Sequence, residues 1–556
     1  MFANRTRRSW VYKGAHPGRR KWKSGWKSMS DRGFSTTFVR VSKMEYLWVA
    51  AVATAYLYIF VRVQWRIGDE GDMLNGALAV VQGRVPYRDF YDLRGPLSFY
   101  WLGLFFKIFG ATWRVARLHL LLTGTLTSLL VYHLTKRVSR GAGAVLPCAL
   151  VTVLSIPFWT ASHHHWDSNL FALTATAAFF QWQDHGKSRW LFASGLLAGL
   201  TSCFIYQKGG LLLASFVAVM CVSRLYFRTS VNLVRDVCTI LAGYGIVGLV
   251  VLAWFFRLGA LHDFVDATIR SPLNTYVDAN RLPYAHLLML NALGVAPLQL
   301  FPPAVALASA IVLMLPFLLI AALPFLVVSL VGVRVLTAPA AKVFRPPIIA
   351  YCLVGFALWF SEFHRRDMMH LIYGCPVLLI ALWLLWDSVD WRRVVKIVVP
   401  VMVAVALIFV ATNRALYAAA ANEHILTRRG AIVLPQDDPA LRFLLSDEVA
   451  RGDYVFVYPY YSTYYFLADV RNPTRFGEMM YGPGSKPLFD EAIAAIEAKQ
   501  VKYILWDTVV AGENLKEWFP AYRQPPENER WMETYFQTHY EQLAVLSGFR
   551  ILRRRQ

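Results

Sequence analysis

MEYLWVAAVATAYLYIFVRVQ, residues 44–64, is an apolar stretch long enough to form a membrane-spanning helix. The hydrocarbon core of a bilayer is about 30 Å thick, and about 20 apolar residues of helix are needed to cross it. Ten further apolar runs follow, so the sequence predicts about eleven spans. They lie near residues 115–135, 142–160, 168–183, 190–206, 209–226, 237–256, 303–333, 347–361, 369–386 and 394–412.

The composition excludes several other classes of protein. Of the 556 residues, 56% are hydrophobic and 17% are charged, against roughly 25% charged in soluble domains. A disordered chain, a coiled coil or an ordinary soluble enzyme is therefore not expected. The net charge of +22 fits either a nucleic-acid binder or a membrane protein with basic cytoplasmic loops.

The positions of the basic residues favour the membrane protein. Residues 1–43 contain 12 Lys or Arg and a single acid, Asp31, which predicts a disordered cytoplasmic arm that contacts anionic lipid. Further basic residues follow every second span, as the positive-inside rule expects. They are Lys136, Arg137, Arg140, Lys187, Arg189, Arg224, Arg228, Arg235, Arg334, Lys342, Arg345, Arg392, Arg393 and Lys396. We expect a cytoplasmic N-terminus, an extracytoplasmic C-terminus and no nucleic-acid partner.

Two apolar segments differ from the others. The run 303–333 is too long for one straight span, and Pro316 and Pro324 predict a kinked or strongly tilted helix, or two short helices. Residues 97–109, LSFYWLGLFFKIF, are too short to span. Counting them would reverse the sidedness of every later loop, so we expect an interfacial helix.

The sequence changes character near residue 435. Residues 439–450 and 488–499 predict helices, and residues 453–458 and 501–506 predict strands. The predicted fold is thus an all-α polytopic membrane domain over 44–434 and a small α/β extracytoplasmic domain over 435–556. This second domain has no Gly-rich phosphate loop or nucleophile elbow, so we expect it to serve as a cap or recognition domain.

Acidic residues cluster directly after the first span. Asp69, Glu70 and Asp72 lie within four positions, and charge is rare near a membrane without a function. Asp69 or Glu70 could instead cap a helix at 72–82, but a cap needs only one acid. Asp167 lies at the same membrane edge, where it and Asp69 could act as a general base and its partner.

Basic residues occur on the same side, where the positive-inside rule does not explain them. They are Arg94, Lys208, Arg270, Arg281, His364, Arg365, Arg366 and His370, with Glu362 and Asp367 among them. Cations beside acids in an apolar setting predict a site for a lipid-linked phosphate. His163, His164 and His165 are consecutive, and neighbouring side chains of a regular element point apart. The acids permit a divalent metal but do not require one.

Several segments resemble the polytopic C-type glycosyltransferases, which include the protein O-mannosyltransferases and the lipid A aminoarabinose transferase. The most specific is DEGDMLNGALAVVQGRVPYRDFYDLRGPLSFYWLGLFFKIFG, residues 69–110. The others are GLLAGLTSCFIYQKGG (195–210), RSPLNTYVDANRLPY (270–284), FSEFHRRDMMHLIYGCP (360–376) and YFLADVRNPTRF (465–476).

The resemblance implies a role for each candidate residue. Asp69 and Glu70 match the family's acid–base pair, and Asp167 matches the acid of its second outer loop. Residues that match the basic groups near the donor phosphate are Arg94, Lys208, His364, Arg365 and Arg366, although Arg94 stands where Lys is common. Asp72, His165 and His370 are further candidates. The implied reaction is inverting transfer of a sugar from a polyprenyl-phosphate donor, with Asp69 as base.

Other functions remain open at this stage. A transporter or flippase of lipid-linked sugars would also have many spans, but no paired repeats are present. A polymerase or ligase that uses polyprenyl-pyrophosphate donors would bind phosphate with similar cationic groups. A non-catalytic assembly subunit is a further alternative. The acceptor could be a lipid, a glycan of the cell envelope or a protein. Asn4, in the predicted cytoplasmic arm, is the only usable glycosylation motif, which favours a bacterial inner membrane.

Overall fold

The computed structural model describes residues 43–65, 68–139, 142–226, 232–273, 282–286, 302–337, 345–479, 486–508, 527–546 and 548–556. Almost all of the predicted basic arm, residues 1–42, lies outside the described residues, as does Arg281.

Each of the eleven predicted apolar runs forms helix. They correspond to α2 (Lys43–Val61), α5 (Trp113–Val138), α6 (Val145–Leu154), α7 (His164–His185), α8 (Ser188–Ser202), α9 (Tyr206–Leu225), α10 (Leu233–Arg257), α13 (Pro303–Thr337), α15 (Pro346–Ser361), the pair α16 (Met368–Gly374) and α17 (Pro376–Ser388), and α18 (Arg393–Ala419). The predicted polytopic helical fold is confirmed. The long run 303–333 lies in the single 35-residue helix α13, with Pro316 and Pro324 inside it.

The structure has fewer helices that are long and apolar enough to cross a membrane than the sequence predicts. Within the described residues, six are long and apolar enough, namely α2, α5, α9, α10, α13 and α18. The pair α16 and α17 would make a seventh, although it bends by 68°. Of the remaining runs, α6, α8 and α15 form shorter helices. Helix α7 is long enough but more polar, and much of it is buried against other helices.

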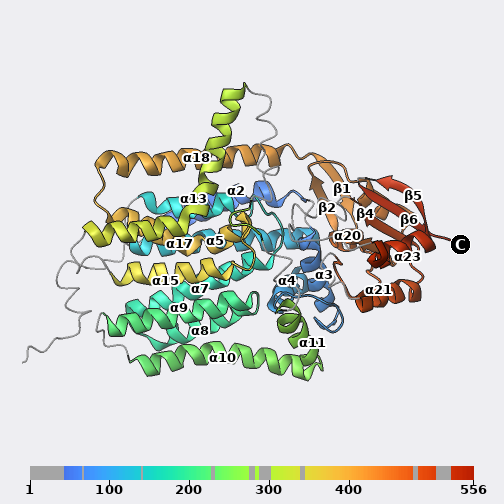
Figure 1. The fold of residues 1–556 in the computed structure, drawn as a ribbon, viewed down its shortest axis with the longest axis horizontal. Coiled ribbons are helices and arrows are strands. Elements are labelled where there is room, and N and C mark those ends of the chain that lie inside the picture. Colours follow the sequence, from blue (N-terminus) through green and yellow to red (C-terminus); the bar gives the residue numbers. More distant parts are fainter. Residues whose placement is uncertain are drawn as a thin grey trace, which may run out of the picture.

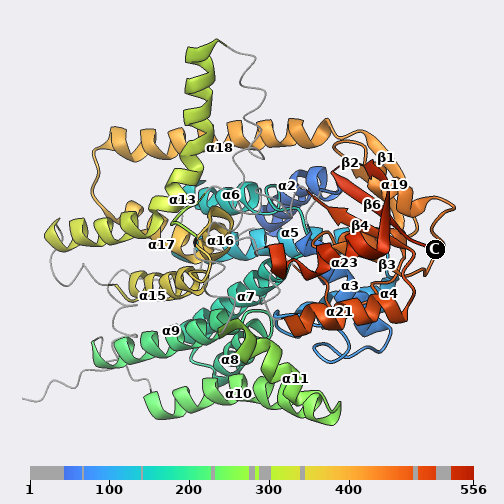
Figure 2. The same ribbon diagram turned by 45° about the vertical axis from the view of Figure 1, so that its right-hand side comes forward.

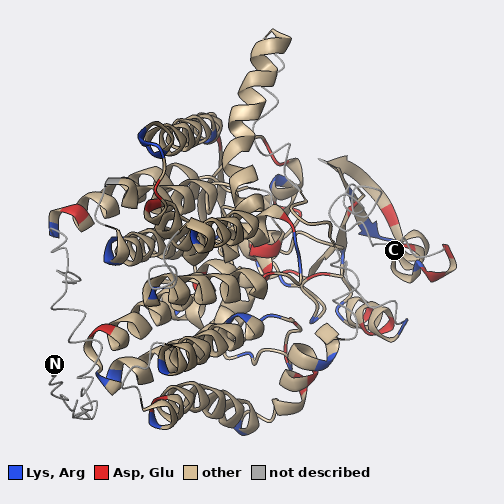
Figure 3. Cartoon of the chain, turned by 60° about the vertical axis from the view of Figure 1, so that its left-hand side comes forward, with Lys and Arg blue, Asp and Glu red and all other residues tan. Residues whose placement is uncertain are grey.

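The helices pack side by side into a bundle (Figure 1). Its largest apolar core joins residues of α5, α6, α7, α9, α13, α15 and α17. At one end of the bundle lie α3 (Asp69–Val81), α4 (Leu97–Phe109), α11 (Leu261–Val265) and the C-terminal domain (Figures 1 and 2). Charged residues lie mostly at helix ends and in loops, whereas the helix bodies are largely uncharged (Figure 3).

The C-terminal domain contains a mixed four-stranded sheet in the order β3-β4-β6-β5. Its strands are β3 (Val455–Tyr458), β4 (Tyr503–Asp507), β5 (Tyr540–Leu546) and β6 (Phe549–Arg554). Strand β3 pairs with β4 in parallel, and the other pairs are antiparallel. Helices α21 (Lys486–Ala498) and α23 (Trp531–His539) cover one face, and α19 (Pro439–Leu445) and α20 (Thr463–Ala468) cover the other. The predicted α/β domain is therefore confirmed.

A shared apolar core attaches this domain to the membrane part. Leu74 of α3 and Phe106 of α4 belong to the same buried cluster as Phe466 of α20. The rings of Phe106 and Phe466 stack with their centroids 5.6 Å apart. The hairpin of β1 (Glu423–Thr427) and β2 (Gly430–Leu434), which precedes residue 435, also contributes to this cluster. The contact holds the end of the bundle and the outer domain together around the candidate site.

Candidate active site

Asp69 opens helix α3 and remains accessible. The N-cap position is Gly68, which offers no side-chain cap, so neither Asp69 nor Glu70 acts as the cap that the sequence also allowed. The side chain of Asp69 is 30% exposed, and its Oδ1 accepts a 3.0 Å hydrogen bond from the hydroxyl of Tyr460. The same hydroxyl accepts a 3.1 Å bond from the backbone N–H of Asp69. Nε2 of His163 lies 3.9 Å from Oδ2.

Asp72 contacts the C-terminal domain and Arg94, a cation of the segment between α3 and α4. Its Oδ2 lies 3.1 Å from Nη1 of Arg94, which also contacts Asp92 at 2.8 Å. Its Oδ1 accepts a 2.8 Å hydrogen bond from Ser462. Burial raises the pKa of Asp72, and Arg94 partly offsets this effect. Arg94 is therefore held at the site, but by acids of the protein.

Glu478 lies beside Asp72 in the C-terminal domain. Burial and the neighbouring Asp72 raise the pKa of Glu478 well above its ordinary value. Two carboxyl groups in such close contact cannot both ionise easily, so this pair retains a proton to a higher pH than either acid would alone.

The close approach of these two parts depends on glycine. A Cβ at Gly71 would lie 2.0 Å from the backbone nitrogen of Thr463, and one at Gly477 would lie 2.3 Å from Oδ1 of Asp72. Any larger side chain at either position would push the C-terminal domain away from α3.

Glu70 points away from solvent into a closed network. It is fully buried, and its two oxygens lie 2.7 and 2.8 Å from the guanidinium of Arg117. The backbone N–H of Ser162 and the side chain of Gln64 also donate to Glu70. This arrangement holds the start of α3 against α5 and does not expose the carboxylate predicted to share the catalytic role.

Asp167 is also buried, on helix α7. Its Oδ1 accepts a 3.1 Å hydrogen bond from Thr123 and lies 3.1 Å from Nε2 of His119. Both partners belong to α5. The structure thus directs Asp167 toward a neighbouring helix, rather than to the accessible edge of Asp69.

Lys208 is committed to neighbouring side chains. It is fully buried, and its Nζ lies 2.5 Å from Oε1 of Glu362. It also donates hydrogen bonds to Ser168 and Asn169. A lysine held in this way joins α9, α7 and the end of α15, and it does not present a free ammonium group to a phosphate.

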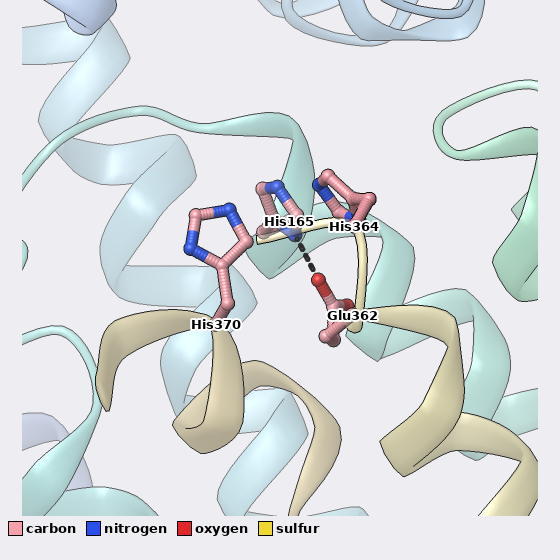
Figure 4. A group of neighbouring side chains, drawn as sticks. All are labelled: His165, Glu362, His364 and His370. Atoms are coloured by element: carbon pink, nitrogen blue, oxygen red, sulfur yellow. Dashed lines mark ion pairs between the residues drawn. The ribbon is translucent and has the colours of Figure 1, made fainter. Parts of the chain in front are cut away.

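Four side chains from distant segments converge next to this lysine. They are His165, Glu362, His364 and His370, which point toward one another (Figure 4). Nδ1 of His165 lies 3.1 Å from Oε2 of Glu362. The three consecutive histidines also cluster, with centroids of neighbouring rings 4.3 and 4.4 Å apart. They do not diverge as expected because His163 has extended backbone and the helix begins only at His164.

The two arginines of the loop 362–367 differ. Nε of Arg365 lies 2.6 Å from Oδ2 of Asp367, and Asp367 also caps α16 by accepting from the backbone N–H of His370. Burial alone would raise the pKa of Asp367, but His370 and Arg365 outweigh it and hold this pKa well below its usual range. Arg366 is half-buried, and no side-chain partner is recorded for it among the described residues.

Of the residues predicted from the sequence, Asp72 and Arg94 are in contact, and His165, His364 and His370 lie together. Glu70, Asp167 and Lys208 are instead paired with Arg117, His119 and Glu362. The sequence did not indicate Tyr460, Ser462 and Glu478, which lie in the C-terminal domain expected to serve as a cap or recognition domain. The aromatic run YPYYSTYY, residues 458–465, directly follows a predicted strand and was the available indication.

Comparison with known proteins is consistent with this architecture. Residues 93–254 match the family model described as dolichyl-phosphate-mannose-protein mannosyltransferase. No curated protein sequence matches the chain significantly.

Two solved structures share the fold at low sequence identity. ArnT from Cupriavidus metallidurans is 12% identical, with a TM-score of 0.52, and the match covers 92% of this chain and 97% of ArnT. The oligosaccharyltransferase from Archaeoglobus fulgidus, solved with Zn and sulfate, is 14% identical with a TM-score of 0.51. That match covers 83% of this chain and 68% of the oligosaccharyltransferase. The chain is therefore similar in sequence to this mannosyltransferase family over residues 93–254, and similar in fold to ArnT and to the oligosaccharyltransferase.

Proposed function

We propose that the protein transfers a sugar from a polyprenyl-phosphate donor to an extracytoplasmic acceptor, with inversion at the anomeric carbon and Asp69 as general base. One observation carries the choice of base. The side chain of Asp69 is 30% exposed, whereas those of Asp72 and Glu70 are 8% and 1% exposed. A general base must come within hydrogen-bond distance of the proton that it removes.

The surroundings of Asp69 suit this role. Tyr460 holds Oδ1, so the acceptor would approach Oδ2. In the proposed reaction Oδ2 takes the proton of an acceptor hydroxyl or amine. The acceptor atom then forms the new bond to the anomeric carbon, and the bond between that carbon and the phosphate oxygen breaks. The lipid phosphate leaves with the electron pair.

Cationic side chains would stabilise the leaving phosphate. Arg366 is the best candidate, because it is half-buried at the site and a guanidinium binds phosphate with two parallel hydrogen bonds. Arg94 is a second candidate, although phosphate would have to compete there with Asp72 and Asp92. Lys208, His364 and Arg365 would act indirectly, by shaping the loop that carries Arg366. Preorganised charge of this kind lowers the barrier without a separate general acid.

The donor class is supported by the matched family, whose description names a dolichyl-phosphate sugar. We further propose that the protein resides in a bacterial inner membrane with the site on the extracytoplasmic face. The basic C-terminal turn of α5, with Lys136 and Arg137, would then face the cytoplasm, as the positive-inside rule expects.

The test is turnover by the purified full-length chain in lipid nanodiscs. A panel of polyprenyl-phosphate and polyprenyl-diphosphate sugars is supplied with candidate acceptors, and the released lipid is identified by mass spectrometry. Release of polyprenyl monophosphate, together with inverted anomeric configuration in the product, supports the proposal. Release of polyprenyl diphosphate would instead favour a polymerase or ligase. Movement of the lipid across the bilayer without sugar transfer would favour a flippase.

A further inference from the structure

The group formed by His165, Glu362, His364 and His370 has the composition of a metal site. One ligand atom from each residue lies within 4.8 Å of those of the other three. The residues come from three places in the fold: the first turn of α7, the loop after α15 and the first turn of α16. Their side chains face a common point (Figure 4).

Burial and missing hydrogen bonds point to a ligand at this position. Glu362 is fully buried and His165 is 3% exposed. Oε1 of Glu362 pairs with Lys208, whereas Oε2 of Glu362 and Nδ1 of His165 lack a hydrogen bond of normal geometry within the described part of the chain. Leaving buried polar atoms unsatisfied is costly. An ion between these atoms would satisfy them.

The spacing fits tetrahedral coordination. Bonds of about 2.0 Å from a tetrahedral zinc ion place neighbouring ligand atoms about 3.3 Å apart. Nδ1 of His165 and Oε2 of Glu362 are 3.1 Å apart. The ring centroid of His370 lies 4.9 Å from that of His165 and 5.2 Å from that of His364, and all four ligand atoms lie within 4.8 Å of one another. The side chains would move closer together around a bound ion.

Neighbouring residues also support two of the ligands. Nδ1 of His370 lies 3.0 Å from both oxygens of Asp367, which leaves Nε2 as the ligand atom. A carboxylate that accepts from the second nitrogen of a metal-binding histidine is typical of protein metal sites. Lys208 contacts Oε1 of Glu362 and leaves Oε2 for the ion.

We propose that these four residues bind one divalent transition-metal ion, with zinc as the best match. Three imidazoles and one carboxylate suit zinc, cobalt or nickel better than the oxygen-preferring magnesium and calcium. Four protein ligands fill a tetrahedral site, which is typical of a structural rather than a catalytic zinc. The ion would fasten the loop 362–367, and hence Arg366, to the start of α7. This inference does not depend on the reaction proposed above.

The first test measures zinc in the tag-free, full-length protein in nanodiscs after chelator treatment, reloading with zinc and removal of excess ion. We expect about one zinc per chain by mass spectrometry, and at least a 100-fold lower affinity in His370→Ala. Asp367→Asn, which removes the carboxylate that supports His370 and pairs with Arg365 but keeps all four proposed ligands, should lower the affinity about 10- to 100-fold.

His164→Ala is the matched control. His164 adjoins His165 and belongs to the alternative group of three consecutive histidines, so this variant should keep its zinc. Loss of zinc from His164→Ala with retention in His370→Ala would overturn the assignment. So would a wild-type protein that retains no zinc.

A second measurement needs no variant and so does not depend on whether the substituted chains fold. X-ray absorption at the zinc edge of the wild-type protein should show four ligands, of which three are imidazoles. A spectrum dominated by water oxygens would contradict the proposal.

Discussion

The hydroxyl of Tyr460 donates a 3.0 Å hydrogen bond to Oδ1 of Asp69, although 391 positions separate the two residues in the chain. The bond joins the C-terminal domain to the first residue of α3. The C-terminal domain therefore lies against the candidate active site and contributes Tyr460, Ser462 and Glu478 to it.

Asp69→Asn should lower turnover by at least ~100-fold, because the amide cannot accept the proton of the acceptor and general bases typically contribute 10²–10⁴-fold. The measurement is the initial rate of lipid-phosphate release by protein with unchanged thermal stability. Asp437→Asn, at an exposed acid of the outer domain, is the control and should be as active as wild type. Near-normal turnover of Asp69→Asn would remove Asp69 from the base role.

Tyr460→Phe should lower kcat by about 10- to 100-fold, since a hydrogen bond to a charged group is worth about 1.5–3 kcal/mol. Tyr464→Phe serves as the matched control. Tyr464 also donates to a carboxylate, at 2.7 Å, but its partner is Asp438 of the C-terminal domain and not a residue of α3. Equal activity of the two variants would show that the contact between Tyr460 and Asp69 does not matter for turnover.

Glu70→Ala should destabilise the protein by about 3–5 kcal/mol, because it leaves the buried guanidinium of Arg117 without its carboxylate. Thermal unfolding in nanodiscs measures the effect. Glu541→Ala removes an exposed ion pair with Arg553 and should cost less than about 1 kcal/mol. If Glu70→Gln kept full stability but lost all turnover, Glu70 would return to the catalytic role that the sequence suggested.

Glu478→Gln should make stability less sensitive to pH. The folded-state pKa of Glu478 is raised well above its ordinary value of 4.5 by burial and by Asp72. The folded state therefore loses stability as pH rises from the unfolded pKa to the folded pKa, at up to about 1.4 kcal/mol per pH unit. We expect the unfolding temperature of the wild type to fall more than that of Glu478→Gln as pH rises above about 5. Parallel curves for the two proteins would contradict the assignment.

Arg366→Ala should raise the KM for the donor lipid by about 10-fold or more, because charge-assisted hydrogen bonds to phosphate are worth about 1.5–3 kcal/mol. Arg270→Ala is the control, since Arg270 is an exposed residue that pairs only loosely with Asp266, at 3.7 Å. An unchanged KM in Arg366→Ala would leave Arg94 as the remaining candidate for the phosphate contact.

Local properties of the sequence were enough to predict the helices. Every apolar run became helix because a long apolar segment has to satisfy its backbone hydrogen bonds internally. The number of clear spans was harder to predict. Residues 142–160, for example, contain a three-residue 3-10 helix, the ten-residue helix α6 and a following turn, because chain buried among other helices need not match the thickness of a bilayer.

The sequence by itself determined a polytopic helical protein with a small α/β domain and an acidic cluster at one membrane edge. Only the tertiary structure decided the roles within that cluster. Asp69, Glu70 and Asp72 lie within the first four positions of α3, so they point in different directions. Asp69 is therefore partly exposed beside Tyr460, and Glu70 is buried against Arg117. Asp72 contacts Arg94 and Glu478. These partners lie between 22 and about 400 positions away, and no local pattern in the sequence encodes which of them each acid will meet.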